Sequence, residues 1–294
     1  MLKLLQSFGA VCLLYGLLIG AVAADTSVWK ITKNGNTVYL GGTIHVLTAS
    51  DYPLPAAFRQ AYSRSSIIYF EVDLNELAGS SFFEMLGRAS SYPLGESLRD
   101  KLTEETWLQL DDFLADRGLS ASAVSHLRPG AIMSTLLALE LTRLGVSADG
   151  VDHYYHQQST ADKKEIRAFE TAQQQVQLIT GLGAGDEEAF IQYLIEDLDG
   201  LSVTFEKMRE AWLHGDNSLL ASVSRLEELK TEDPLTYGAL LTNRNTAWLP
   251  EIEQMFNSEE VELVLVGALH LAGEDGLLKL LSDRGYRVMQ MESH

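Results

Sequence analysis

Two short segments near opposite ends of the chain share one pattern, and this pattern constrains the fold more than any other feature. Residues 38–45 (VYLGGTIH) and 263–270 (LVLVGALH) are each an apolar run followed by Gly-x-x-His. A short apolar run that is partly β-branched and ends in glycine is typical of a buried strand. His45 and His270 therefore fall just past the carboxyl ends of two predicted strands. In open α/β sheets, ligands bind at that edge.

The sequence that follows each histidine strengthens the comparison. Each is followed by a loop rich in proline or glycine, then by a helical stretch, then by another strand. Each copy therefore predicts a βαβ unit with a histidine at its first turn. The predicted helices and strands cover residues 56–64, 67–73, 277–283 and 286–290.

The rest of the chain completes the predicted fold. A hairpin signal at Asn34-Gly35-Asn36 precedes the first of these strands and predicts an antiparallel amino-terminal edge of the sheet. Between the two units the sequence is mainly helical, with one short apolar strand at residues 166–169. We expect a single α/β (α+β) domain over residues 25–294: a mixed sheet built from the two βαβ units, with a large helical insertion at about 96–256.

Residues 1–24 have the features of a secretory signal peptide. Lys3 supplies the positive charge, residues 8–22 are apolar and uncharged, and Ala21-Val22-Ala23 is a small-x-small cleavage site. An uncleaved membrane anchor is the alternative, but the run is short and ends in small residues rather than basic ones. We expect the signal to be removed and the protein to be exported, either periplasmic or secreted, with no stable membrane span.

Composition excludes several classes of function. The one cysteine, Cys12, lies inside the apolar run, so the expected mature chain has no disulfide framework, cysteine nucleophile or thiolate zinc site. The chain carries 22 basic and 41 acidic residues, a formal net charge of −19. Such a surface repels phosphate backbones and anionic headgroups, which argues against nucleic acid and a peripheral membrane role. It suits cationic peptides, although solubility alone also explains it.

The two strand-end histidines form a candidate site for a divalent metal. Histidine nitrogen and carboxylate oxygen bind zinc, manganese and cobalt, and a metal with an open position lowers the pKa of a bound water. A histidine at a strand end also has a purely structural explanation. Moreover, the His-Glu-x-x-His signature of zinc peptidases does not occur in the sequence.

Two glutamates also lie at the ends of apolar strands. Glu71 and Glu170 sit in contexts where a carboxylate is costly unless it is paired, coordinated or protonated. Both are therefore candidates for a metal ligand or a general base. The alternative is a buried salt bridge to Arg244.

The remaining histidines carry less information. His153 and His156 are three residues apart on a predicted helix beside two glutamines, which favours a solvated face. Surface positions are expected for His126, His214 and His294. Neither a Gly-x-Ser-x-Gly elbow nor a P-loop occurs, so serine-hydrolase and nucleoside-triphosphate chemistry lack their usual signatures.

Six segments, in order along the chain, carry a resemblance to a known family. They are residues 40–45 (LGGTIH), 69–73 (YFEVD), 150–152 (GVD), 169–172 (FETA) with Gln175, 243–245 (NRN) and 266–277 (VGALHLAGEDGL). In these segments the chain resembles the TraB/GumN family, which also contains the TIKI proteins that act on Wnt. The pair of Gly-x-x-His motifs, with a glutamate after the first, is the specific part of the match.

The resemblance implies a metal-dependent hydrolase, and more narrowly a peptidase, that uses manganese or cobalt. It implies that the two histidines and the first glutamate are essential. The matching positions are His45, His270 and Glu71, with Glu170 as a second acid or ligand, Arg244 as a carboxylate or oxyanion partner, and Asp152 as an anchor at a helix start.

We therefore expect metal-assisted hydrolysis of a peptide or protein substrate in the cell envelope. A manganese, cobalt or zinc ion would be held by His45, His270 and Glu71, with Glu71 also orienting or deprotonating the attacking water. A non-catalytic envelope protein that binds peptides or glycans in the same cleft is the alternative from another class, and non-peptide ester hydrolysis is a third. The sequence leaves the oligomeric state open.

Overall fold

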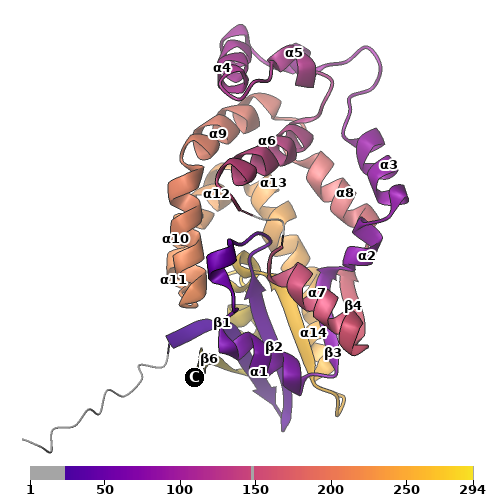
Figure 1. The fold of residues 1–294 in the computed structure, drawn as a ribbon, viewed down its shortest axis with the longest axis vertical. Coiled ribbons are helices and arrows are strands. Elements are labelled where there is room, and N and C mark those ends of the chain that lie inside the picture. The colour runs from indigo at the N-terminus through magenta and orange to yellow at the C-terminus, as the bar shows by residue number, and fades with distance from the viewer. Residues whose placement is uncertain (1–23, 147–148, 294) are drawn as a thin grey trace, which may run out of the picture.

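The computed structural model describes residues 24–146 and 149–293. Residues 1–23 of the expected signal peptide, and His294, lie outside this part of the chain. Within the described ranges, no helix is both long enough and apolar enough to cross a membrane. Figure 1 shows a sheet with its covering helices in the lower half and a lobe of helices above it.

The lower half is built on one mixed sheet of six strands in the order β4-β3-β5-β2-β1-β6. Strand β1 is antiparallel to both of its neighbours, whereas the pairs β2–β5, β5–β3 and β3–β4 are parallel. The predicted α/β class is therefore confirmed. The strands are β1 (Ala24–Lys33), β2 (Asn36–Thr43), β3 (Ile67–Val72), β4 (Glu165–Glu170), β5 (Glu262–Gly267) and β6 (Arg287–Ser293).

Both βαβ units form, but their strands are interleaved. The first connects β2 to β3 through α1 (Ala56–Arg64), and the second connects β5 to β6 through the short helix η4 (Ala268–Leu271) and α15 (Leu277–Asp283). Strand β5 inserts between β2 and β3. The expected hairpin of β1 and β2 forms, but the prediction that it makes the edge of the sheet is wrong, because β6 pairs with the outer side of β1. Interleaving makes the carboxyl ends of β2, β5 and β3 direct neighbours.

Helices cover both faces of the sheet, which explains the continuous apolar runs of its central strands. On one face, Val38 and Leu40 pack with α14 (Asn243–Met255) and α15. On the other, Tyr39 packs with α1, α7 (Val151–Asp162) and α10 (Leu201–Leu213). All six residues of β3 are buried, as expected for a parallel strand inside a three-layer arrangement.

The upper lobe has an apolar core of its own, formed chiefly by α4, α5, α6 and α9 (Figure 1). Two helical stretches of the chain are each divided into two shorter helices. Residues 74–88 form α2 and α3, which meet at Gly79, and residues 217–230 form α11 and α12, because Arg225 adopts a left-handed φ of 51°. The remaining elements are η1 (Ala49–Asp51), α2 (Leu74–Leu77), α3 (Ser80–Ala89), η2 (Leu98–Lys101), α4 (Glu104–Ala115), α5 (Ala121–Val124), α6 (Pro129–Arg143), α8 (Ala172–Gly181), α9 (Glu187–Asp199), α11 (Asn217–Val223), α12 (Leu226–Glu232), α13 (Pro234–Tyr237) and the π-helix η3 (Gly238–Thr242).

Candidate functional site

The strand order brings the predicted site residues to one edge of the sheet. His45 follows β2, Glu71 lies near the end of β3, Glu170 ends β4, and His270 lies in η4 just after β5. The register aligns these ends, since Thr43 pairs with Gly267 and Val72 pairs with Glu170. Helix α14, which packs against one face of the sheet, adds Arg244. Segments far apart in sequence thus meet at the carboxyl edge, where parallel sheets bind ligands.

Arg244 lies at the centre of this group. Its Nε donates to Glu170 Oε1 at 2.7 Å, and its Nη2 donates to Glu170 Oε2 at 3.1 Å and also to Glu71 Oε2. Its Nη1 lies 3.0 Å from His270 Nε2. The buried salt bridge considered for the two glutamates is therefore present. Two buried carboxylates share one guanidinium, so the centre retains negative charge that a further cation would offset.

His270 is held as a neutral ring with a defined tautomer. Its side chain is 5% exposed, and burial lowers its pKa to about 4. Nδ1 lies 2.7 Å from Asn245 Oδ1, while the amide nitrogen of Asn245 donates to the carbonyl oxygens of His270 and Asp275. Nδ1 therefore carries the proton and Nε2 carries the lone pair. A neutral imidazole fixed in this way is the form that binds a metal.

Glu71 is held as a carboxylate. Burial favours its neutral form, but the charge that His270 carries at low pH, the charges of Arg244 and His45, and the N–H of Gly267 outweigh burial and lower the pKa to about 2. The Gly267 N–H donates to Glu71 Oε1 at 2.6 Å. Glu71 is thus ionised throughout the neutral range, and its two oxygens point in fixed directions.

His45 occupies a different environment. Its side chain is 68% exposed, and Nδ1 lies 2.8 Å from Asp152 Oδ2. The Asp152 carboxylate raises the pKa of His45 above its ordinary value. Because two thirds of the ring is exposed, water screens this pair.

A close backbone approach brings Asp152 to His45. The Val151 N–H donates to the Ile44 carbonyl at 3.1 Å. At Gly150, an added Cβ would lie 2.2 Å from the carbonyl carbon of His45. Only glycine allows α7 to begin so close to the β2 exit, which is a physical reason for the sequence Gly150-Val151-Asp152.

The expected metal ligands face one small space above Gly267. A Cβ added to Gly267 would lie 3.2 Å from Glu71 Oε1, 3.6 Å from His270 Cδ2 and 3.8 Å from His45 Nε2. His270 Nε2 is 3.7 Å from Glu71 Oε1. The absent side chain of Gly267 therefore leaves a cradle bounded by both histidines and the glutamate.

The donor atoms around this cradle are of the types that bind a divalent cation. The cradle offers neutral imidazole nitrogen and ionised carboxylate oxygen, and it lies in a centre with residual negative charge. Over residues 24–146 and 149–293, however, no group of three or more His, Cys, Asp or Glu side chains has the spacing of a metal site. Arg244 forms hydrogen bonds to Glu71 and Glu170, and its Nη1 lies 3.0 Å from His270 Nε2. A cation would compete with Arg244 for these atoms, and the ligand set stays a prediction.

Sequence reasoning gave no role to three residues that shape the site. Asn245 fixes the His270 tautomer, Gly267 binds Glu71 and leaves the cradle, and Trp248 packs its ring 4.5 Å from that of His270. The sequence does contain a signal for Asn245. Arg244 and Asn245 are polar, whereas the other residues on the inner side of their helix are apolar. Buried polar groups of this kind need partners.

One expectation about the other histidines is wrong. His156 is buried rather than solvated: its Nε2 lies 2.8 Å from Asp73 Oδ1, and its ring packs against Phe70. The cause is that α7 lies across the end of β3 and turns this face of the helix inward. His153 is on the solvated side beside Asp149, as expected. His126 and His214 are exposed.

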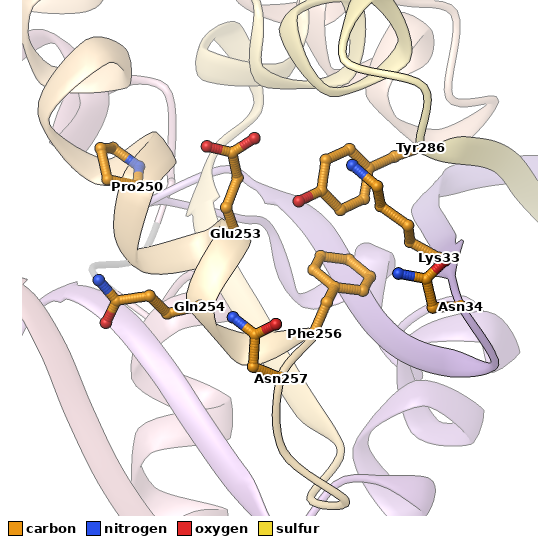
Figure 2. A pocket seen from close by; sticks show the side chains of 8 residues that line it. All are labelled: Lys33, Asn34, Pro250, Glu253, Gln254, Phe256, Asn257 and Tyr286. Atoms are coloured by element: carbon orange, nitrogen blue, oxygen red, sulfur yellow. The ribbon is translucent and has the colours of Figure 1, made fainter.

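A separate surface pocket of about 380 Å³ lies at the other end of the sheet. Figure 2 shows Lys33, the last residue of β1, and Asn34 of the turn that follows, with Phe256, Asn257 and Tyr286 around them. The Lys33 ammonium sits over the Tyr286 ring at 3.7 Å. Because this pocket is at the amino end of β2, it is not part of the histidine site.

Comparison with known proteins identifies the family of the chain. The chain is 25% identical over 256 residues to the uncharacterized protein YbaP of Escherichia coli K12 and to that of Shigella flexneri, covering 85% of this chain and 90% of each relative. It is 27% identical over 176 residues to the metalloprotease TIKI1 of Danio rerio, covering 51% of this chain and 35% of that protein. No solved structure matches significantly. The model of the TraB/PrgY/gumN family matches residues 27–290, so the chain belongs to that family.

Proposed function

We propose that this protein is a metal-dependent hydrolase of the cell envelope, exported to the periplasm or secreted, and that it cleaves peptide bonds. The observation that carries the proposal is the convergence of His45, Glu71 and His270 around the cradle at Gly267. The similarity to a protein named as a metalloprotease supports peptide rather than other substrates.

His45 and His270, through their Nε2 atoms, and Glu71, through a carboxylate oxygen, would hold the ion, with Glu170 as a further acid. A divalent manganese, cobalt or zinc ion bound there would polarise the scissile carbonyl and lower the pKa of a bound water.

The state of Glu71 indicates its role. A general base works best when its pKa lies near the operating pH, and a pKa of about 2 makes Glu71 a weak base. Fixed by Arg244 and by the Gly267 N–H, it suits holding or orienting a water better than removing its proton.

Arg244 and Asp152 would have roles other than binding the ion. The guanidinium of Arg244 lies among the acids of the site and would stabilise negative charge on a substrate oxygen or bind a substrate carboxylate. Asp152 keeps the proton of His45 on Nδ1 and so directs Nε2 toward the cradle. It is a positioning residue.

Metal binding tests the first half of the proposal. The mature chain is dialysed against manganese, cobalt or zinc, and bound metal is measured by mass spectrometry. The His45→Ala/His270→Ala double variant should lose the ion. The His126→Ala/His214→Ala variant, which removes two exposed histidines away from the site, should retain it. Equal metal content in the two variants would contradict the ligand set.

Turnover tests the second half and separates the enzyme from a binding protein. The loaded protein should cleave members of a peptide mixture with time, and Glu71→Gln should lower the rate at least about a hundredfold. Peptide binding by the wild type with no product at any time would favour the binding protein.

A further inference from the structure

A second cavity lies in the helical lobe, and two of its lining residues border the site. Its volume is about 520 Å³, which is within the range of pockets that bind small ligands. Helices α9 and α10 line one side, and α12 and α13 line the other (Figure 1).

The cavity shares backbone with the candidate active site. Leu269, which lines it, immediately precedes His270. Leu240 also lines it, and its carbonyl accepts a hydrogen bond from Arg244 Nη1 at 3.3 Å. A chain bound with one side chain in the cavity would therefore lie close to the segments that carry Arg244 and His270.

The inner wall of the cavity is apolar. Leu194, Leu201 and Met208 contribute from α9 and α10, and Leu229 contributes from α12. Burying an aliphatic or aromatic side chain against such a wall is favourable, at roughly 25 cal/mol for each Å² removed from water.

The rim is acidic. Five carboxylates line it against one guanidinium, that of Arg225. Arg225 is already paired with Glu228 and Asp197. The carboxylates are Glu196, Asp197, Glu228, Glu232 and Asp233.

The hydrogen-bond partners of the other carboxylates do not offset the negative charge of the rim. Glu232 accepts from the Tyr193 hydroxyl at 2.9 Å, and Asp233 accepts from the Thr236 N–H at 2.9 Å, so both partners are neutral. Burial raises the pKa of Asp197, and the carboxylates of Glu196 and Glu228 raise it further against the effect of Arg225. The rim therefore favours cations and repels anions.

We propose that this cavity is the substrate subsite and that it takes a peptide whose apolar side chain is flanked by lysine or arginine. The assignment rests on the proposed function, because it places the bound chain across the hydrolytic site. The apolar side chain fills the cavity, and the flanking cations meet the acidic rim. The net charge of −19 over the whole chain acts in the same direction by attracting cationic peptides.

Binding without turnover tests the subsite. Fluorescent acetyl-Lys-Lys-Leu-Phe-Lys-Lys-amide is titrated into the Glu71→Gln variant, or into metal-stripped wild type if that variant does not fold. The comparison peptides replace the lysines by glutamate or Leu-Phe by Ser-Ser. Each replacement should weaken binding about tenfold or more. Raising the ionic strength from about 0.1 M to about 1 M should weaken binding of the basic peptide.

A matched pair of variants locates the binding. Glu196→Lys/Glu232→Lys should weaken binding of the basic peptide about tenfold or more, because it reverses two charges of the rim. Asp112→Lys changes charge on the exposed side of α4 and should leave the affinity unchanged. Equal affinity for basic and acidic peptides, or no effect of the rim variant, would overturn the subsite. Selective binding without cleavage by the loaded wild type would instead contradict the hydrolase and leave the subsite standing.

Discussion

The two Gly-x-x-His motifs look alike in sequence, but their histidines differ in exposure, in hydrogen-bond partner and in the direction of their pKa shifts. His45 is 68% exposed and paired with a carboxylate, whereas His270 is 5% exposed and paired with an amide. Asp152 raises the pKa of His45, while burial lowers that of His270 to about 4. The same sequence pattern thus gives one histidine whose protonated form is stabilised and one whose neutral form is stabilised.

The difference shows that the strand end fixes where a histidine lies, and that its Nδ1 partner fixes what it can do. Asp152 comes from α7 and Asn245 from α14. Both are supplied by the helical insertion, not by the βαβ units. A metal bound at the proposed site would have to displace a proton from His45 but would find His270 already neutral. Exchanging the two partners is therefore the most direct way to test the comparison.

The largest effect is expected from Asn245→Asp. It gives buried His270 a carboxylate 2.7 Å from Nδ1 and should raise the pKa of His270 from about 4 to above its ordinary value of about 6.5. In the parent protein, unfolding takes up a proton between these two values, so stability rises with pH across that window. The variant should lose or reverse that slope.

Histidine NMR titration of the metal-free protein measures this change, and urea unfolding at several pH values measures the slope. Asn245→Ala is the control, because it removes the amide without adding a charge. A His270 pKa that stays near 4 in Asn245→Asp would show that burial alone sets the state of the ring.

Gly150→Ala should have the next largest effect. Its Cβ would lie 2.2 Å from the His45 carbonyl carbon, so α7 must move away and Asp152 must move with it. Overpacking of this kind costs about 1–3 kcal/mol of unfolding free energy. Gly87→Ala, in α3 with nothing within 4 Å of its Cβ, is the matched control and should be neutral or stabilising. Equal stability of both variants would contradict the close approach.

The two motif glycines should respond differently to alanine. At Gly42 the new Cβ would lie 3.1 Å from the Cα of Ala268, so the substitution pushes the two motifs apart and should cost about 1 kcal/mol. At Gly267 it would lie 3.2 Å from Glu71 Oε1 and would fill the cradle. Thermal unfolding should show the larger loss for Gly42→Ala, and metal binding the larger loss for Gly267→Ala. The reverse order would place the ligand site elsewhere.

Much of the site could be predicted from the sequence because its key residues follow strands. An apolar run with a glycine exit placed His45 and His270 at strand ends, and the acids in apolar contexts identified Glu71 and Glu170. The salt-bridge alternative also named Arg244. These are local patterns, and local patterns survive folding when packing agrees with them.

The strand order and the histidine partners could not be predicted in the same way. Strand β5 inserts between β2 and β3 because segments far apart in the sequence pair with each other. The hydrophobic periodicity of a short segment gives no information about such pairing. The burial of His156 depends on the placement of α7 across β3, and neighbouring glutamines gave the opposite signal. The role of Asn245 becomes visible only once α14 lies against η4.

The smallest effect is expected from Asp152→Asn, the reciprocal exchange. It should lower the pKa of His45 toward its ordinary value, but by less than Asn245→Asp raises that of His270, because water screens an exposed pair. A raised histidine pKa stabilises the fold below the ordinary value and stops doing so as pH rises through the raised value. The variant should therefore be slightly less stable than the parent near pH 6 and equally stable at high pH. The same NMR titration measures both exchanges, and a larger shift at His45 than at His270 would mean that exposure does not govern these two sites.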